Sequence, residues 1–241
     1  MLVLSRSEVE AALDVDALLD ALERAFVALS AEEASVPPRI AAITPSGFLG
    51  AMAAYVDGTL AAKLVSVFAG NHERGLPSHQ ALVALFDDDD GRPLAVMDGA
   101  HITAMRTAAA SAVATRALAR PDAAALAIVG AGVQGQAHLE VVPRVRDFAE
   151  ARVVSRTRAH AEEVSARYGA AAARSFEDAV RGADVVCLCT DSPDSVIRRE
   201  WLAPGTHVTS VGYAGGRGEI DVETVRAGLV VVESRVALEP P

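Results

Sequence analysis

The chain has 241 residues, of which 51% are hydrophobic, 22% charged and 4% aromatic, and its formal net charge is −10. This composition can bury enough apolar surface to offset chain entropy, which excludes a disordered chain. An acidic chain repels phosphate, so we expect no nucleic-acid partner. The first ten residues lack a signal-like apolar core, and no uncharged run approaches the ~20 residues of a membrane span. We therefore expect a cytoplasmic protein that does not bind membranes.

The cysteines are Cys187 and Cys189, two positions apart in a strand-like run. Alternate residues of a strand point the same way, and a bridge between them would distort the backbone. We therefore expect two buried free thiols. Two cysteines do not supply the four ligands of the usual zinc site, so no metal is expected.

The first part of the chain, 1–118, indicates helices followed by antiparallel strands. Ser7 and Glu10 fit a capping box, and Asp14 can cap a longer helix with apolar residues along one side. The acidic stretch 87–91 lacks the spaced ligands and closing glutamate of a calcium loop, so we expect a hairpin turn there. Four β-like runs follow the helices: 48–54, 60–68, 81–86 and 93–97.

The remaining part, 119–241, follows a different pattern. An alanine-rich helix at 102–119 bridges the two parts, and Pro121 stops it. Continuous apolar strands that alternate with helices indicate a parallel sheet covered on both faces. The sequence thus predicts an α/β fold, a doubly wound parallel sheet of the Rossmann type joined to a smaller α+β domain. The expected strands are 126–129, 152–154, 183–188, 207–211 and 229–232.

A glycine-rich motif, G-x-G-x-x-G, directly follows the strand that ends at Val129 and precedes a helix expected at 136–145. Gly130 permits the tight turn, Gly132 lets backbone N–H groups approach a pyrophosphate, and Gly135 lets helix and strand pack closely. The helix N-terminus adds a partial positive charge. We predict that Val133 and Gln134 join these glycines in binding a dinucleotide.

The next strand ends in Ser155, Arg156, Thr157 and Arg158, where an NAD site usually has a carboxylate for the ribose 2′-hydroxyl. Arg156 can instead bind a 2′-phosphate through two N–H groups. The sequence therefore favours NADP(H), with NAD(H) as the alternative. Four further residues lie at carboxyl ends of strands, where a coenzyme commonly sits: Thr190, Ser192, Val211 and Gly212.

Three cations belong to three different elements of the first part. Lys63 lies in an apolar strand, Arg106 in the bridging helix, and Arg39 after a double proline. They can converge on one carboxylate of an amino or imino acid beside a nicotinamide, although spacing alone does not show that they meet. The alternative is that they are ordinary solvated or packing cations.

Taken together, these motifs resemble the ornithine cyclodeaminase / mu-crystallin family over nearly the whole chain. The glycine motif is one of the matching stretches. The others are Pro38-Arg39, AKLVSV at 62–67 leading to Asn71, LPSHQ at 76–80, MDG at 97–99, ITAMRTAA at 102–109, ADVV at 183–186, WLAPG at 201–205 and GEID at 218–221.

The resemblance implies a substrate-binding and dimerisation domain at 1–118 and an NAD(P)-binding domain at 119–241, in a homodimer. The C-terminal part is short relative to the family. The resemblance places Thr107 near the cofactor, and Lys63 in a position to steer protons. It implies that the small-molecule substrate is bound by Arg39, Lys63, Ser78, His79 and Arg106.

One departure from the family bears on the reaction. Tyr213 occupies the place where ornithine cyclodeaminases have an aspartate that accepts a proton, and a tyrosine is a far weaker base. Tyr213 can still donate a proton, which suits imine reduction. We therefore expect an NADP(H)-dependent oxidoreductase that reduces a small imino acid or interconverts an amino and a keto acid, with Lys63 and Tyr213 catalytic. The alternatives are an ammonia-releasing cyclodeaminase that uses bound NAD and a non-catalytic ligand-binding protein.

Overall fold

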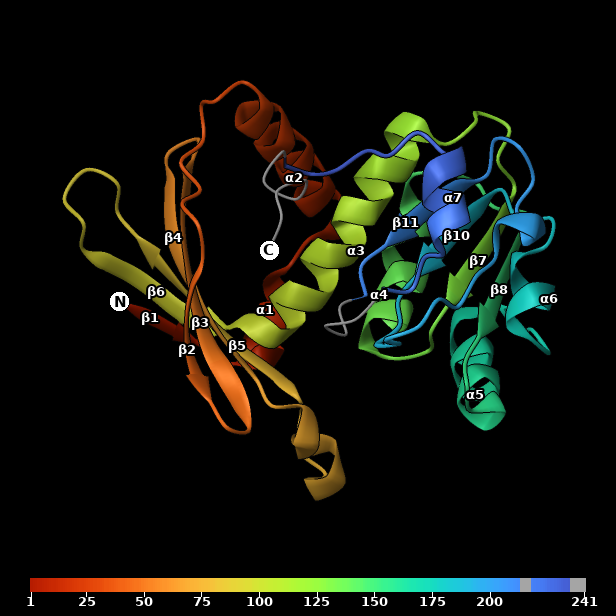
Figure 1. The fold of residues 1–241 in the computed structure, drawn as a ribbon. Helices are drawn as coiled ribbons and strands as arrows, with labels where there is room; N and C mark the ends of the chain where they lie inside the picture. Colours follow the sequence, from red (N-terminus) through yellow and green to blue (C-terminus); the bar gives the residue numbers. More distant parts are fainter. Residues whose placement is uncertain (213–217, 235–241) are drawn as a thin grey trace. The chain divides into compact units, whose positions relative to one another are not determined.

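The computed structural model describes residues 1–212 and 218–234, and it divides into two compact units (Figure 1). The first holds Met1–Thr103 and the second Ala104–Val232. This division falls inside helix α3 (Gly99–Leu118), whereas the sequence placed the domain boundary after that helix. Within the described ranges, no helix is both long enough and apolar enough to cross a bilayer.

The first unit contains a six-stranded sheet in the order β1-β6-β5-β4-β3-β2. The four predicted strands are confirmed as β3 to β6, and β1 and β2 join them at the two edges. β1 runs parallel to β6, and the other neighbours are antiparallel. The strands are β1 (Leu2–Leu4), β2 (Ile40–Thr44), β3 (Gly47–Val56), β4 (Thr59–Val67), β5 (His79–Phe86) and β6 (Pro93–Asp98).

Two helices precede most of this sheet, α1 (Arg6–Ala12) and α2 (Val15–Ser30). Asp14 caps α2 by accepting a hydrogen bond from the backbone of Ala17 at 2.8 Å, as predicted. The predicted capping box of α1 was wrong by two residues, since Glu8 binds the backbone N–H and the hydroxyl of Ser5. Starting earlier adds a half-turn to a short helix and leaves Glu10 to pair with Arg6 at 2.7 Å.

The acidic stretch at 87–91 forms the predicted turn between antiparallel strands β5 and β6. Arg92 joins its two ends, binding Asp87 at 2.8 Å and Asp90 at 2.7 Å. A six-residue 3-10 helix, Ala69–Arg74, connects β4 to β5. Among the residues that the structure describes, no group of His, Cys, Asp or Glu side chains is arranged to hold a metal ion.

The second unit contains a five-stranded parallel sheet in the order β11-β10-β7-β8-β9, which confirms the predicted fold class. The two-residue strand β9 was missed because it is too short to show a pattern. The predicted strand at 229–232 was wrong, because this largely exposed segment pairs with none of the strands that the structure describes. The strands are β7 (Ala125–Val129), β8 (Glu150–Val154), β9 (Ala171–Ala172), β10 (Val185–Leu188) and β11 (His207–Ser210).

Helices cover both faces of this sheet. α4 and α5 contact each other and the strands, and α6 packs with the buried side chains of Ala127, Val129 and Leu188. The predicted helix at 136–145 begins at Val133, three residues earlier, and its last part is a short 3-10 helix, Val142–Arg144. The remaining elements are α4 (Val133–Val141), α5 (Arg158–Tyr168), α6 (Phe176–Val180), the 3-10 helix Arg199–Trp201 and α7 (Val222–Ala227).

Cys187 lies in β10, which neighbours the central strand β7, and Cys189 directly follows β10. Cys187 and Cys189 are both free and buried, as predicted. Burial raises the pKa of Cys187 to about 12, and burial also raises the pKa of Cys189 well above its usual range. Both side chains are therefore protonated at neutral pH, so they behave as small apolar groups that fill the sheet.

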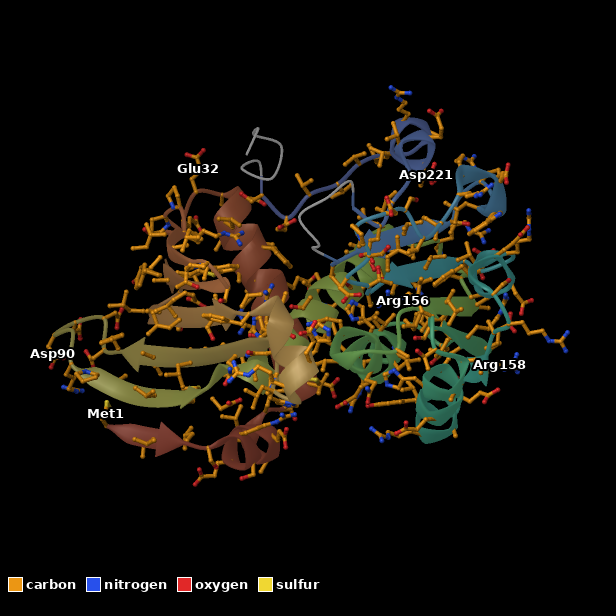
Figure 2. The ribbon with its side chains drawn as sticks, turned by 60° about the horizontal axis from the view of Figure 1, so that its bottom comes forward. Met1, Glu32, Asp90, Arg156, Arg158 and Asp221 are labelled. Carbon is orange, nitrogen blue, oxygen red and sulfur yellow. The ribbon has the colours of Figure 1, made fainter. Side chains whose placement is uncertain are left out.

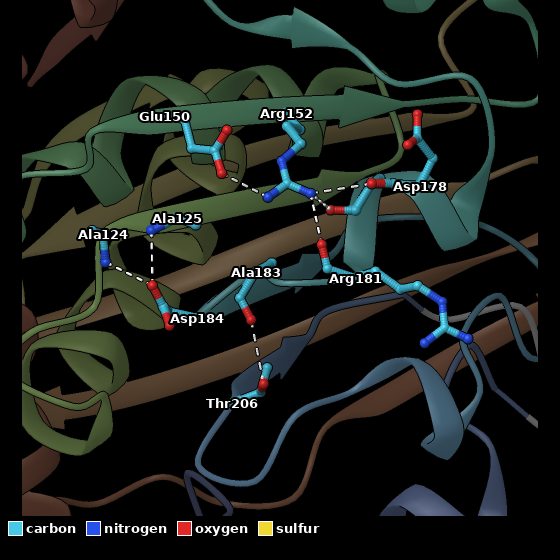
Figure 3. Close-up of polar contacts among 10 residues, drawn as sticks. Ala124, Ala125, Glu150, Arg152, Asp178, Arg181, Ala183, Asp184 and Thr206 are labelled. Atoms are coloured by element: carbon cyan, nitrogen blue, oxygen red, sulfur yellow. Dashed lines mark hydrogen bonds and ion pairs between the residues drawn. The ribbon is translucent and has the colours of Figure 1, made fainter.

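Charged side chains hold the amino edge of this sheet together (Figure 3). Asp184, just before β10, accepts hydrogen bonds from the backbone of Ala124 at 2.8 Å and Ala125 at 3.0 Å, and it pairs with Arg120. These backbone hydrogen bonds, that of Ala124 first, lower the pKa of the Asp184 carboxyl. Arg152 donates to three carbonyl groups at the end of α6 and to Glu150 at 2.7 Å.

A buried histidine joins α3 to α4. His138 shares a hydrogen bond of 2.9 Å with Ser111 and one of 2.7 Å with the carbonyl oxygen of Gln134. Burial lowers the pKa of His138 to about 4. The imidazole is therefore neutral in the folded protein at neutral pH.

We expect His138 to make the protein less stable in weak acid. The unfolded chain binds a proton near pH 6.5 and the folded chain only near pH 4, so its contribution to the free energy of unfolding falls as pH drops between these values. The expected loss from pH 7 to pH 5 is about 2 kcal/mol. Urea unfolding at both pH values should show a smaller loss in His138→Gln than in the exposed control His160→Gln. Equal losses would contradict the assignment.

Candidate coenzyme and substrate sites

The glycine motif forms a tight turn between β7 and α4. Gly130 has a φ of +111°, and a Cβ there would lie 2.5 Å from the carbonyl oxygen of Cys189. A Cβ at Gly135 would lie only 1.8 Å from the carbonyl oxygen of Gly130. Both positions therefore require glycine for packing, as the motif predicts.

Gly132 differs from these two glycines because it faces open space. A Cβ there would meet no atom within 4 Å, and its φ of −69° suits any residue. Gly132 is the N-cap of α4, so the N–H groups of Val133 and Gln134 are in the first turn and have no partner within the helix. Open space beside unpaired donors at a helix start fits a bound phosphate.

The carboxyl end of β8 lies next to this turn, because the N–H of Gly130 donates to the carbonyl of Val154 at 2.8 Å. Ser155 is half-buried there, and Thr157 is the N-cap of α5. The side chain of Arg156 is 83% exposed and lies 3.8 Å from Asp191. The side chain of Arg158 pairs with Glu162 one turn further along α5, with 2.7 Å between Nε and Oε1. Arg156 is therefore the better placed of the two arginines to bind a phosphate. Both are labelled in Figure 2.

The carboxyl ends of β10 and β11 lie on the other side of β7. Thr190 and Ser192 follow β10, and Val211 donates to the carbonyl of Leu188 at 3.1 Å. A Cβ at Gly212 would lie 2.3 Å from the carbonyl oxygen of Thr190, so this position also requires glycine. Four of the predicted cofactor segments, the glycine turn and the residues that follow β8, β10 and β11, thus meet at one edge of one sheet.

Glu219 is the residue of this edge that the sequence did not reveal. Its side chain is 2% exposed and accepts hydrogen bonds from Thr190, Ser210 and Gly212. The GEID stretch is part of the family resemblance, which assigns no role to this glutamate. The sequence feature that could have indicated a role is a glutamate next to the apolar Ile220. It lies between a glycine-rich segment and the helix that Asp221 caps.

Helix α3 carries two of the predicted residues, Arg106 and Thr107, in the second unit. Arg106 is exposed and Thr107 is half-buried, one turn before Ser111, which bonds His138 of α4. Thr107 therefore lies one helical turn from the contact between α3 and the helix of the glycine motif. This placement fits the expected position near the cofactor.

The remaining substrate residues belong to the first unit. Lys63 is half-buried in β4, on the same face of the sheet as Val65, which is 4% exposed. Register pairs Val67 with His79, so His79 shares this face, and Ser78 precedes it. Arg39 directly precedes Ile40, whose partner Ala51 is followed by Met52, the partner of Lys63. If that register is extended by one residue, Arg39 lies opposite Met52 and therefore in the same cross-strand row as Lys63.

The structure thus gathers the predicted residues into two groups. Lys63, His79 and, by register, Arg39 share one face of the first unit's sheet, and the proposed coenzyme-binding strand ends lie in the second unit with Arg106 and Thr107. Lys63 belongs to the first unit and Arg106 to the second, and their convergence on one substrate stays a prediction. Tyr213 lies outside the described residues.

A parallel sheet whose first strand leads through this glycine turn into a helix defines a dinucleotide-binding protein of the Rossmann type. The model of the ornithine cyclodeaminase/mu-crystallin family matches residues 1–239, and the chain belongs to this family. The resemblance expected from the motifs is thereby confirmed.

Three similar proteins illustrate this family. Ketimine reductase mu-crystallin of Mus musculus is 41% identical over 196 residues, which are 79% of this chain and 63% of that protein. A structure of Thermococcus litoralis Δ1-pyrroline-2-carboxylate reductase with NADH and L-proline is 38% identical, with a TM-score of 0.87 over 94% of this chain and 73% of that one. An archaeal alanine dehydrogenase dimer with bound NAD is 33% identical, with a TM-score of 0.89 over 94% and 72%.

Proposed function

We propose that the chain is an NADP(H)-dependent oxidoreductase that reduces the C=N bond of a small, preferably cyclic, imino acid. Interconversion of an amino and a keto acid shares this reduction step on an open-chain imine, which forms from the keto acid and ammonia with loss of water. The observation that carries the proposal is Lys63, half-buried on the face of the first unit's sheet that also holds the buried Val65. The names of the similar proteins support it, since they include ketimine and pyrroline-carboxylate reductases.

Lys63 is the single lysine of the chain, and every other residue with a permanently charged basic side chain is an arginine. An arginine serves well wherever only a positive charge is needed. A lysine differs because its ammonium can release a proton, which a guanidinium does not do. The half-buried strand position of this one lysine therefore supports a chemical role for it.

The proposed mechanism divides the work between the two units. Arg39, Lys63 and Arg106 hold the substrate carboxylate, and the Lys63 ammonium gives a proton to the imine nitrogen. Gly132, Val133 and Gln134 hold the pyrophosphate at the start of α4. When bound, the reduced nicotinamide supplies the hydride that the imine carbon accepts. The protein contributes orientation, which is a large part of the rate in such a reaction.

An absorbance assay tests this proposal. NADPH or NADH is mixed with the protein and Δ1-pyrroline-2-carboxylate or Δ1-piperideine-2-carboxylate, and consumption of the reduced coenzyme is followed. A parallel sample with ornithine and NAD is assayed for ammonia. Substrate-dependent oxidation of the coenzyme supports the reductase. Ammonia without net coenzyme consumption, or coenzyme binding without turnover, overturns it in favour of a cyclodeaminase or a binding protein.

We also propose NADP(H) as the preferred coenzyme, on the exposed guanidinium of Arg156 beside the glycine turn. We expect Arg156→Asp to shift the ratio of kcat/KM values from NADPH toward NADH by about 10- to 100-fold, since a charge-assisted pair is lost and a repulsion is added. Arg226→Asp on α7 makes the same charge change far along the sequence and should leave the ratio unaltered. An unaltered ratio in both variants would refute the assignment.

A homodimer is the assembly that we propose, from the exposed apolar face of the first unit's sheet. Ile40, Ala51, Leu64 and Leu82 pair in one row across four strands, and the three larger side chains are 71%, 44% and 51% exposed in chain order. Water-exposed apolar rows of this kind mark interaction surfaces. Light scattering should give twice the chain mass of 25.0 kDa, and a monomer would contradict the proposal.

A further inference from the structure

The buried carboxylate of Glu219 joins the carboxyl ends of two neighbouring strands. One oxygen, Oε2, accepts from the N–H of Thr190 at 2.8 Å and from its hydroxyl at 2.6 Å. The other, Oε1, accepts from the N–H of Gly212 at 2.6 Å and from the hydroxyl of Ser210 at 2.9 Å. Thr190 follows β10, whereas Ser210 is the last residue of β11 and Gly212 follows it. A single side chain thus fixes the spacing of the two strand ends.

This arrangement suits the two oxygens of a carboxylate. All four donors are neutral, and each oxygen receives two of them, so both oxygens act only as acceptors. An amide of the same shape would place an NH₂ group against two donors. Among the residues that the structure describes, no cation hydrogen-bonds to this buried carboxylate, and burying such a group is costly unless donors satisfy it, which indicates a position that serves more than packing.

The contacts of Glu219 extend into the segment that follows β10. The Thr190 hydroxyl donates to Glu219 and accepts from the N–H of Ser192 at 3.3 Å, and the Ser192 hydroxyl donates to the carbonyl of Asp194 at 2.7 Å. The carboxylate therefore sets the course of 190–194 as well as the position of Gly212.

The place of these residues on the sheet assigns them to one half of a dinucleotide. The sheet order reverses at β7, with β8 on one side and β10 and β11 on the other. The glycine turn after β7 takes the pyrophosphate, and the end of β8 takes the adenosine ribose. The other half of the dinucleotide then lies along the ends of β10 and β11.

We propose that Glu219 is a positioning residue for the nicotinamide half of the coenzyme. It acts through Thr190 and Gly212, whose backbone it holds at the sheet edge. The proposal rests on the coenzyme binding of the proposed function, and it adds that the two halves of the coenzyme depend on different residues.

Asp184 supplies a matched control, because it does the corresponding work at the opposite edge of the same sheet. Its carboxylate accepts from the backbone N–H groups of Ala124 and Ala125 at the start of β7 (Figure 3), and it also pairs with Arg120. Asp184→Asn therefore weakens the sheet at the edge away from the coenzyme. It separates loss of stability from loss of positioning.

The test compares the dissociation constants of NADPH and of adenosine 2′,5′-bisphosphate, which lacks the nicotinamide half. By calorimetry at neutral pH, Glu219→Gln should raise the constant for NADPH at least tenfold and leave that for the bisphosphate within twofold. Asp184→Asn should leave both within twofold while lowering the urea midpoint. If the wild type prefers NADH, the pair becomes NADH and adenosine 5′-monophosphate.

Two further variants keep the test decisive if Glu219→Gln does not fold. Ser210→Ala removes one of the four donors and should raise the NADPH constant about threefold with no change for the fragment. Glu219→Asp keeps the carboxylate but shortens its reach, so it should raise the NADPH constant above that of the wild type and leave the constant for the fragment within twofold. Equal loss for coenzyme and fragment, or no loss for either, overturns the inference. A wild type that binds no nicotinamide coenzyme overturns the proposed function instead.

Discussion

Replacing Lys63 with arginine is expected to lower kcat by about 100-fold or more while KM for the imino acid changes little. The guanidinium keeps the positive charge that holds the substrate carboxylate, but it does not release a proton at working pH. General acid catalysis contributes about 10²- to 10⁴-fold to a rate, which sets the size of the loss. The measurement is steady-state kinetics with saturating NADPH.

Lys63→Ala is the matched variant, since it removes both the proton and the charge. We expect kcat to fall as in Lys63→Arg and KM to rise as well, with the NADPH dissociation constant unaltered in both variants. The proposed coenzyme site lies in the other unit, so a loss of coenzyme affinity would point to misfolding. Turnover that survives the arginine substitution would remove Lys63 from proton transfer.

Alanine at Gly132 is expected to leave the protein folded and to weaken coenzyme binding at least tenfold. The added methyl group meets no atom of the protein within 4 Å and the φ of −69° suits alanine, so the free energy of unfolding should be unchanged or slightly higher. The same methyl group stands where a pyrophosphate must approach the N–H groups of Val133 and Gln134.

Gly135→Ala is the opposite case, because its methyl group would lie 1.8 Å from the carbonyl oxygen of Gly130. We expect a large loss of stability or no folded protein. Calorimetric titration with NADPH, after circular dichroism and urea unfolding, distinguishes the two variants. Undiminished affinity in Gly132→Ala would show that the phosphates do not bind at this turn.

Local signals in the sequence were sufficient for most of the fold. The strands around Lys63 and the buried strands of the parallel sheet follow from apolar runs, and the Asp14 cap and the acidic hairpin follow from side-chain chemistry. Short elements were harder. β9 has two residues, and its parallel pairing with β8 comes from the tertiary fold. The segment 229–232 is apolar enough for a strand, but a strand also needs a pairing partner.

The candidate site divides in the same way. The glycine turn is local, so its position and its roles for Gly130 and Gly135 could be predicted. The face that Lys63 occupies depends on register, and a shift of one residue would reverse it. The role of Glu219 depends on contacts with Thr190, 29 residues away, that no spacing rule expresses.

The two thiols of the second unit offer a way to measure how often the parallel sheet opens. Cys187 has neighbours on both sides, pairing with Ile128 of β7 and Thr209 of β11. An alkylating reagent reaches such a protonated, enclosed sulfur only when the middle of the sheet separates, so its rate of labelling reports the opening equilibrium rather than the chemistry of the thiol. A dinucleotide that bridges the strand ends would slow that labelling without touching either sulfur.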